Sequence, residues 1–361
     1  MNYIQKILTF ASVFLVSQCA AGTFVQEKSQ NKTLVLVDTW ATLETHSIFF
    51  DHIQQMGGGN HTLEFKLISG ASETVNIQKF NKYFYDNIIL MAPTAKSFGQ
   101  DLSVKDILEF VDFHHNIMVF LNNQSRKISR ELANAFGIDF EDIGFSMQAG
   151  TVQNQATAPA HAVSNVAWSQ NLFEPLARVF SVPERPILFE DGVGAVLDTP
   201  KRNQHVFPIL RADQGSYSYH GTADEDQKRV GVVSGNQLAL VAGYQTMYNQ
   251  RAVFSGSFKM CSNSAMLATR DPELGTIQSS SNYKLCTEMV EWNLQERGVL
   301  KVDNVRHRKV GDPWTGANPE NYKRQVDIEY FVDIYAKHNG QWVPYVADDV
   351  QFQFTMLDPY Y

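Results

Sequence analysis

Short, unbroken apolar runs recur along the chain, and they constrain its fold more strongly than any other feature. The runs are LVLV (34–37), IILMAP (88–93), IMVFL (117–121), LALVAG (238–243) and AVFSGS (252–257). Apolar runs of this length, without polar alternation, are typical of strands that are covered on both faces, as in a parallel sheet. We therefore expect a largely parallel sheet with helices on both sides.

Segments with helical spacing separate the first three runs. Phe49 and Ile53 lie four residues apart on one predicted helix, which the glycines at 57–59 would end. A second amphipathic stretch follows Ser103, which we expect to be its N-cap, and a third is closed by Gly137. The resulting order, β-α-β-β-α-β-α, predicts a doubly wound α/β domain.

The rest of the chain predicts two further regions. Residues 147–237 are rich in turn-forming residues and predict loops and short antiparallel strands inserted into the α/β domain. The run at 252–257 and a helix at 283–297 would then return to the sheet, so that the α/β domain covers 23–298. Alternating segments at 326–336 and 349–358, with an Asn-Gly turn in 337–341, predict an antiparallel β module over 299–361.

The first 22 residues have the pattern of a cleaved secretory signal peptide. A lysine at position 6 precedes an apolar run at 7–16, and small residues follow at 20–22. That run is shorter than the roughly 20 residues that span a bilayer, and no later stretch of the sequence is long and apolar enough. We exclude residues 1–22 from the fold.

Entry into the secretory pathway bears on the oxidation state of the two remaining cysteines and on whether three asparagines carry glycans. Cys261 and Cys286 form either one disulfide or two buried free thiols. N-x-S/T sequons stand at Asn31, Asn60 and Asn123, which are candidate N-glycosylation sites in an endoplasmic reticulum lumen.

Charge and motifs argue against several classes of ligand. The formal net charge of −8, with one short basic cluster at 306–309, argues against a nucleic-acid partner. The glycines at 57–59 follow a helix where a phosphate-binding loop would open one, and the adjacent His114 and His115 would point apart on a helix. We expect no metal or other cofactor.

Two places in the sequence are candidates for a catalytic site. The turn after 117–121, where a nucleophile would stand, contains Ser125 but neither a cysteine nor a flanking glycine. We expect Ser125 to be a helix cap or the hydroxyl of the Asn123 sequon. Residues 44–47 lie at the carboxyl end of the first strand, where α/β sheets bind ligands, but neighbouring side chains diverge. We expect Glu44 and His46 to make fold or partner contacts, with no catalytic role.

Six blocks of the sequence, in this order, resemble a known family. They are TLVLVDTWATLETHSIFF (33–50), FYDNIILMAPTAKSFG (84–99), RPILFEDGVGAVLD (185–198), RAVFSGSFKMCSNSA (251–265), EWNLQERGVLKVDNVRHRKVGD (291–312) and QWVPYVADDVQFQFTMLDPYY (341–361). The chain is similar to the 48 kDa subunit family of the endoplasmic reticulum oligosaccharyltransferase, which transfers an oligosaccharide from dolichyl diphosphate to asparagine in N-x-S/T.

The resemblance implies a non-catalytic subunit on the lumenal side of the endoplasmic reticulum membrane. It implies a class I glutamine amidotransferase-like fold that has lost its nucleophile, followed by β-rich structure, and other oligosaccharyltransferase subunits as partners. Family members continue past the position of residue 361 into a transmembrane helix that this sequence does not contain, so we expect a truncated sequence. The alternatives are a secreted amidotransferase-like or hydrolase-like enzyme, and a carbohydrate-binding module.

Overall fold

The computed structural model describes most of the chain as one compact unit, Asn31–Tyr361. The described residues are 31–68, 74–80, 82–148, 166–198, 202–220, 230–267, 280–323, 326–338, 341–347 and 350. The predicted signal peptide at 1–22 lies outside them, as does the strand predicted at 349–358 except for Val350.

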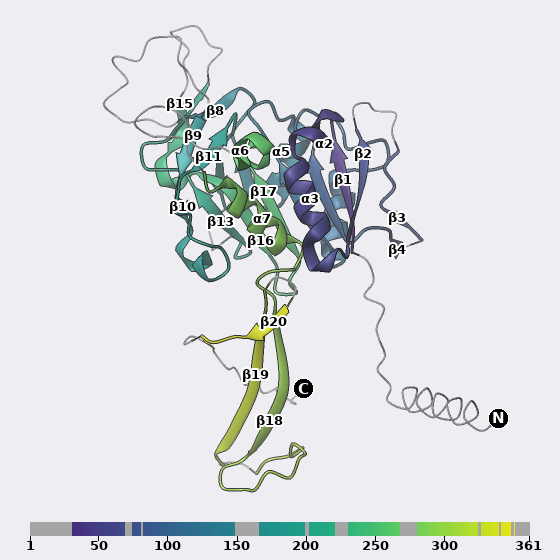
Figure 1. Ribbon diagram of the computed structural model, residues 1–361, viewed down its shortest axis with the longest axis vertical. Coiled ribbons are helices and arrows are strands. Elements are labelled where there is room, and N and C mark those ends of the chain that lie inside the picture. Colours follow the sequence, from purple (N-terminus) through teal and green to yellow (C-terminus); the bar gives the residue numbers. More distant parts are fainter. Residues whose placement is uncertain are drawn as a thin grey trace, which may run out of the picture. The chain divides into compact units, whose positions relative to one another are not determined.

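A ten-stranded sheet is the centre of the α/β body, and its main path runs β10-β13-β16-β17-β6-β5-β1-β2 (Figure 1). The neighbours in the second half of this path are all parallel. Four of the five apolar runs are therefore confirmed as parallel strands. The parallel strands are β1 (Asn31–Val37), β2 (His61–Leu67), β5 (Asn87–Met91), β6 (Asn116–Phe120) and β17 (Arg251–Ser255).

The expectation of a parallel strand is wrong for the run at 238–243. This run forms β16 (Ala239–Gln245), which pairs antiparallel with both β17 and β13 (Val206–Arg211). Its first five residues are all buried. Burial of both faces produces the apolar pattern, and that pattern carries no information on strand direction.

Helices cover both faces of the parallel part, in the predicted order. Ser103 caps α4 through a capping box: its hydroxyl accepts from the backbone N–H of Asp106, and Asp106 accepts from the backbone N–H of Ser103. The φ angles of Gly57 and Gly59 are +58° and +83°, as expected where a helix ends at glycine. The helices are α2 (Ala41–Thr45), α3 (Ser47–Gln55), α4 (Val104–Asp112), α5 (Lys127–Ala135), α6 (Asn263–Met266) and α7 (Asn282–Asn293).

Alternate residues of the parallel strands enter two separate cores. Val35 and Val37 of β1 pack with Phe49 of α3 and Met289 of α7. Leu34 and Leu36 of the same strand belong to the second core, which includes residues of α4 and α5. Both faces of each strand are thus buried, which explains the unbroken apolar runs.

The region between α5 and β16 contains short strands, and within the described residues these strands pair in antiparallel fashion, which confirms the prediction for 147–237 in its described part. β10 is at one end of the main path of the large sheet and pairs with β13. These strands are β7 (Ile138–Phe140), β8 (Phe145–Gln148), β9 (Val166–Ser169), β10 (Asn171–Leu172), β11 (Ile187–Glu190), β12 (Ala195–Leu197), β13, β14 (Tyr217–His220) and β15 (Val230–Ser234).

After this insertion the chain returns to the sheet as predicted. β17 pairs in parallel with β6, and α7 follows. The remaining short elements are β3 (Gln78–Lys79) and β4 (Lys82–Tyr83), with the 3-10 turns η1 (Met56–Gly58), η2 (Glu174–Arg178), η4 (Gly235–Gln237) and η5 (Lys259–Cys261).

A separate three-stranded antiparallel sheet follows α7. It consists of β18 (Leu300–Lys309), β19 (Ile328–His338) and β20 (Gln341–Pro344), and the β19–β20 pairing confirms the predicted hairpin. None of its described side chains is buried. Over the whole described part of the chain, each helix is too short or too polar to cross a membrane.

Candidate functional site

An open α/β sheet binds its ligand at the carboxyl ends of its parallel strands. In this chain these ends belong to β1, β5, β6 and β17. Asp38 follows β1, and its Oδ2 accepts a 2.7 Å hydrogen bond from the hydroxyl of Thr94, which follows β5. The backbone N–H of Thr94 donates to the same oxygen at 3.3 Å. We name this end of the sheet the mouth. The Asp38 carboxylate therefore links the ends of β1 and β5.

The turn after β6 holds Ser125 in a contact with its own neighbour. The Oγ of Ser125 accepts from the backbone N–H of Asn122 at 2.7 Å and donates to Oδ1 of Asn122 at 3.3 Å, and the side chain is 2% exposed. The expectation that Ser125 caps the helix is wrong. α5 has Arg126 as its N-cap residue and no side-chain cap, because the Ser125 hydroxyl closes the turn before it.

Catalysis at Ser125 would need a base within hydrogen-bonding distance. In the described residues, the hydrogen-bond partners of its Oγ are the two Asn122 atoms. The turn therefore lacks the acid–base pair of an activated nucleophile.

The segment 190–194 covers the ends of β6 and β17. The backbone N–H of Asn123 donates to the Asp191 carbonyl, and that of Val193 donates to the Gly256 carbonyl, both at 3.0 Å. The Ser257 hydroxyl donates to the Glu190 carbonyl at 2.6 Å. A Cβ atom at residue 256 would lie 2.0 Å from the Val193 carbonyl oxygen, so this close approach requires glycine. The chain's own backbone therefore covers the mouth at the ends of β6 and β17.

Lys259, Glu190 and Asp191 form a charged cluster at the rim of the mouth. The ammonium group of Lys259 lies 2.6 Å from Oδ2 of Asp191 and 3.1 Å from Oε1 of Glu190. The hydrogen bond to Asp191 is the largest cause that raises the pKa of Lys259, with Glu190 adding to it against the effect of burial. A lysine with a raised pKa stays protonated at neutral pH, so it is unsuited to nucleophilic chemistry.

Glu44 and His46 lie beside the mouth, where α2 meets α3. The His46 side chain is 1% exposed, its Nε2 lies 3.1 Å from the Phe258 carbonyl oxygen, and its Nδ1 lies 2.9 Å from Oγ1 of Thr45. Burial lowers the pKa of His46 and outweighs its backbone hydrogen bonds. The Glu44 residue is exposed, and its backbone carbonyl accepts from Asn263. A neutral, buried His46 suits a contact that holds the segment after β17 against α2.

Asn263 is a site residue that sequence reasoning missed. Its Nδ2 donates to the Glu44 carbonyl at 2.8 Å and to Oγ of Ser47 at 2.9 Å, and its Oδ1 accepts from the backbone N–H of Ile48 at 3.0 Å. The partners lie more than 200 residues away in sequence. A lone asparagine in a serine-rich loop gives no local signal of this bridging role.

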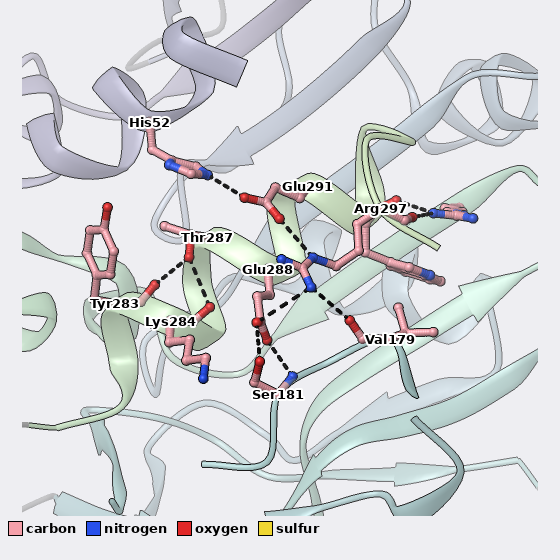
Figure 2. A network of polar contacts seen from close by, with 11 residues as sticks. His52, Val179, Ser181, Tyr283, Lys284, Thr287, Glu288, Glu291 and Arg297 are labelled. Carbon is pink, nitrogen blue, oxygen red and sulfur yellow. Dashed lines mark hydrogen bonds and ion pairs between the residues drawn. The ribbon is translucent and has the colours of Figure 1, made fainter. Parts of the chain in front are cut away.

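A buried polar network on α7 was also missed (Figure 2). Glu291 lies 3.1 Å from Nε2 of His52 and accepts from Nε of Arg297 at 2.8 Å. Burial acts to raise the pKa of Glu291, but the hydrogen bonds from His52 and Arg297 outweigh it, so the pKa lies below its ordinary value. Glu288 accepts from the backbone N–H and the hydroxyl of Ser181 at 2.7 and 2.6 Å. The network joins α3, α7 and the segment after η2.

The other candidate residues are spread over the fold. Cys261 of η5 and Cys286 of α7 are joined by a disulfide in the structure. Asn31 and Asn60 are neighbours at the start of the sheet, since the Asn31 N–H donates to the Asn60 carbonyl at 3.0 Å. The Asn123 side chain is half-buried at the opposite end of the parallel strands.

The two adjacent histidines point to different partners. The Nδ1 of His114 lies 3.0 Å from Nε2 of Gln250, whereas the His115 ring stacks on Phe110 with 4.3 Å between centroids. Among the described residues, no group of three or more His, Cys, Asp or Glu side chains is arranged to hold a metal ion.

The geometry defines an α/β protein in which its own main chain covers the ends of two central strands, β6 and β17. A family model described as "OST48, N-terminal domain" matches residues 25–296, and a second, "OST48 middle domain", matches residues 307–361. The chain belongs to the family of 48 kDa subunits of dolichyl-diphosphooligosaccharide–protein glycosyltransferase.

Proteins carrying that name in three organisms are similar to the chain along its length. The Arabidopsis thaliana protein is 28% identical, covering 100% of this chain and 80% of the relative. The Caenorhabditis elegans protein is 30% identical, covering 100% and 77%. The Danio rerio protein is 30% identical, covering 99% and 77%.

Solved structures show weaker likeness. A crystal structure of Agd3, described as a novel carbohydrate deacetylase, has a TM-score of 0.41 and 7% identity over 74% of this chain and 33% of its own. A ThuA-like protein from Parabacteroides merdae has a TM-score of 0.36 and 14% identity over 73% and 90%. Both scores are too low to bear on the fold or function of this chain.

Proposed function

We propose that the chain is a non-catalytic subunit of the endoplasmic reticulum oligosaccharyltransferase complex. In this role it supports the transfer of an oligosaccharide from dolichyl diphosphate to asparagine in N-x-S/T, through assembly and stability of the complex with its other subunits. The observation that carries the proposal is membership of the 48 kDa subunit family, with the matched residues 25–296 and 307–361.

The covered ends of β6 and β17 support the non-catalytic assignment. The place of a nucleophile is occupied by a turn whose hydroxyl bonds Asn122, and the segment 190–194 is bonded over the ends of β6 and β17. The alternative of a secreted amidotransferase-like or hydrolase-like enzyme would need an open mouth and a base beside Ser125. It is not favoured.

The body of the chain, in this proposal, descends from a class I glutamine amidotransferase-like fold. Support comes from the parallel order β17-β6-β5-β1-β2 with helices on both faces, and from the turn after β6 at the position of the lost nucleophile. The α/β domain covers 23–298 and the β module begins at 299, a division that the two family-model matches support.

We place the chain on the lumenal side of the endoplasmic reticulum membrane, associated with the membrane through the complex. The signal-peptide pattern at 1–22, the sequons at Asn31, Asn60 and Asn123, and the pair Cys261 and Cys286 all support this compartment. In this setting the sequons are acceptor sites and the two cysteines are oxidised.

Depletion of the protein tests the proposed function. The expected results are under-glycosylation of a reporter glycoprotein and loss of the catalytic oligosaccharyltransferase subunit from material purified through a neighbouring subunit. Wild-type protein should restore both, and so should Ser125→Ala, provided that its melting temperature matches the wild type. Unchanged glycosylation after depletion would contradict the proposal. Failure of a stably folded Ser125→Ala variant to restore glycosylation would favour the enzyme alternative.

A further inference from the structure

A second polar site lies at the β10 edge of the large sheet, away from the mouth. A pocket of about 780 Å³ is formed by the β10–η2 segment, the turn after β13, and η4. This volume is within the range of ordinary small-ligand sites. The lining residues are Asn171, Leu172, Phe173, Glu174, Pro175, Arg211, Asp213, Gln214 and Asn236.

The floor of the pocket is fixed by hydrogen bonds. Nδ2 of Asn171 donates to Oδ1 of Asp213 at 2.8 Å and to the Ala212 carbonyl at 3.2 Å. The hydroxyl of Ser169, a residue with 0% exposure, donates to the Arg211 carbonyl and lies 3.3 Å from the same Asp213 oxygen. These bonds use one oxygen of Asp213 and the amide nitrogen of Asn171. They leave Oδ2 of Asp213 and Oδ1 of Asn171 as oriented acceptors.

Arg211 supplies the donors. Asn171 and Arg211 are directly opposite each other in the β10–β13 pairing, and the Arg211 guanidinium lies 5.2 Å from the centre of the Phe173 ring. Within the described residues, this guanidinium makes no hydrogen bond and no ion pair. The side chain is half-buried and held by its ring contact, so its five N–H donors are preorganised for an external acceptor.

The charge of the lining decides the class of ligand. An anion would be attracted by Arg211 but repelled by Asp213 and Glu174, while a cation would meet the unpaired guanidinium. Three amide side chains, Asn171, Gln214 and Asn236, add both donors and acceptors. Paired donors and acceptors without a dominant charge match the vicinal hydroxyl groups of a sugar, each of which donates and accepts.

We propose that this pocket binds a neutral oligosaccharide through Arg211, Asp213 and Asn171. The chemical argument that this pocket binds a sugar does not depend on the proposed function. Only the source of the glycan rests on that function, because the complex handles glycans on lipid and on protein. This chain would then hold a sugar itself, beyond its part in assembly.

Isothermal titration calorimetry on the chain from residue 23 onward tests the proposal, with a neutral high-mannose oligosaccharide as the probe. Arg211→Met keeps the hydrocarbon stem on Phe173 and removes the donors, so we expect Kd to rise at least about tenfold. Asn236→Ala, at an exposed position, should raise Kd about threefold. The matched control is Arg202→Met, since Arg202 is 80% exposed and pairs with Asp198 at 3.6 Å. It should bind as the wild type does.

Three results would overturn the proposal. They are the absence of binding heat for the wild type at millimolar glycan, an unchanged Kd for an Arg211→Met variant, and tighter binding of a sialylated oligosaccharide than of the neutral one. The melting temperature of each variant is measured first. If Arg211→Met melts more than a few degrees below the wild type, Arg211→Gln takes its place. If the wild-type chain binds no glycan while the complex that contains it is intact and active, this site is refuted and the proposed function stands.

Discussion

Arg251 holds the carboxyl end of α7 through Trp292. Its guanidinium lies 4.8 Å from the Trp292 ring centre and donates to the Trp292 carbonyl at 2.5 Å, and the residue is fully buried at the start of β17. It also donates at 2.7 Å to the carbonyls of Arg297 and Gly298. One carbonyl in the last turn of α7 and two carbonyls of the loop after it thus share one cation, which the helix dipole also favours at this end.

Arg251→Met should therefore lower the free energy of unfolding by at least about 3 kcal/mol, because several buried carbonyls lose their donor. Burial lowers the pKa of Arg251 to about 9, which leaves the guanidinium charged at neutral pH. Urea unfolding followed by tryptophan fluorescence gives the measurement. Arg202→Met, at a surface position, should change stability by less than about 0.5 kcal/mol. Equal stability of the two variants would contradict the role of Arg251.

Glu291 should make stability depend on pH in the acid range. Its pKa is lower in the folded chain than in the unfolded chain, so the folded state binds fewer protons as the pH approaches 4.5. The stabilisation is present above the unfolded pKa and is lost as pH falls through the folded pKa. Glu291→Gln should cost about 1–3 kcal/mol at pH 7 and progressively less below pH about 4.

Urea titrations at a series of pH values test this dependence. Glu131→Gln is the control, since the Glu131 carboxylate is 54% exposed and pairs with Lys127 on the helix surface. It should cost less than about 0.5 kcal/mol at every pH. A cost for Glu291→Gln that does not change with pH would count against the ion-pair network.

Glu141 should have the opposite pH dependence. Burial, with a smaller contribution from Asp139, raises the pKa of Glu141 to about 7, and its Oε2 is buried without a hydrogen-bond partner in the described part of the chain. The folded state therefore keeps a proton that the unfolded state releases, and stability falls as pH rises from about 4.5 to 7.

Glu141→Gln should stabilise the protein by about 1 kcal/mol at pH 8, after allowance for solvent screening of a partly exposed group. At pH 4 the gain should vanish, because the carboxyl group is protonated in both states. Thermal melts at the two pH values provide the comparison. Destabilisation at pH 8 would show that the ionised carboxylate has a partner.

The pair Cys261 and Cys286 should resist labelling until reductant is added. Both cysteines are fully buried and are 25 residues apart in sequence. The double change Cys261→Ala and Cys286→Ala should lower the free energy of unfolding by about 3 kcal/mol, chiefly through the freedom restored to the unfolded chain. Maleimide labelling in denaturant, with and without reductant, reads the oxidation state. Labelling of both cysteines without reductant would show free thiols.

Asn60 should carry a glycan when the chain is made in the endoplasmic reticulum. It lies between η1 and β2 next to the exposed Gly58 and Gly59, and its Nδ2 contacts the Gly57 carbonyl at 2.9 Å. Asn60→Gln and Thr62→Ala should each remove one step of mass that is sensitive to endoglycosidase. Thr62→Ser keeps the sequon and should keep the mass. Unchanged mobility of the first two variants would mean that the site is unoccupied.

Local patterns predicted the elements whose partners are close in sequence. Ser103 was expected as a cap, and its partner Asp106 is three residues away. The hairpin of β19 and β20 followed from alternation around an Asn-Gly turn. The return of β17 to the sheet after a long insertion was also predicted, because both faces of that strand are apolar.

The individual side-chain and backbone contacts between distant residues were not predictable. Ser125 is predicted to be a helix cap or the hydroxyl of the Asn123 sequon, and nothing in its local sequence separates the cap from the turn that it closes with Asn122. Arg251, read alone, marks only the polar edge of a strand, since its carbonyl partners lie more than 40 residues later. The segment 190–194 acts through backbone atoms, which leave little trace in the identity of the side chains.

The covered part of the mouth also bears on how a small molecule could bind the protein. A compound directed to the ends of β6 and β17 would first have to break the hydrogen bonds that join Asn123 to Asp191, Val193 to Gly256, and Ser257 to Glu190. At about 1 kcal/mol each, these bonds would consume much of the affinity of a small molecule. Chemical probes of this subunit are therefore better aimed at its outer edges, where disrupting a contact need not unfold the sheet.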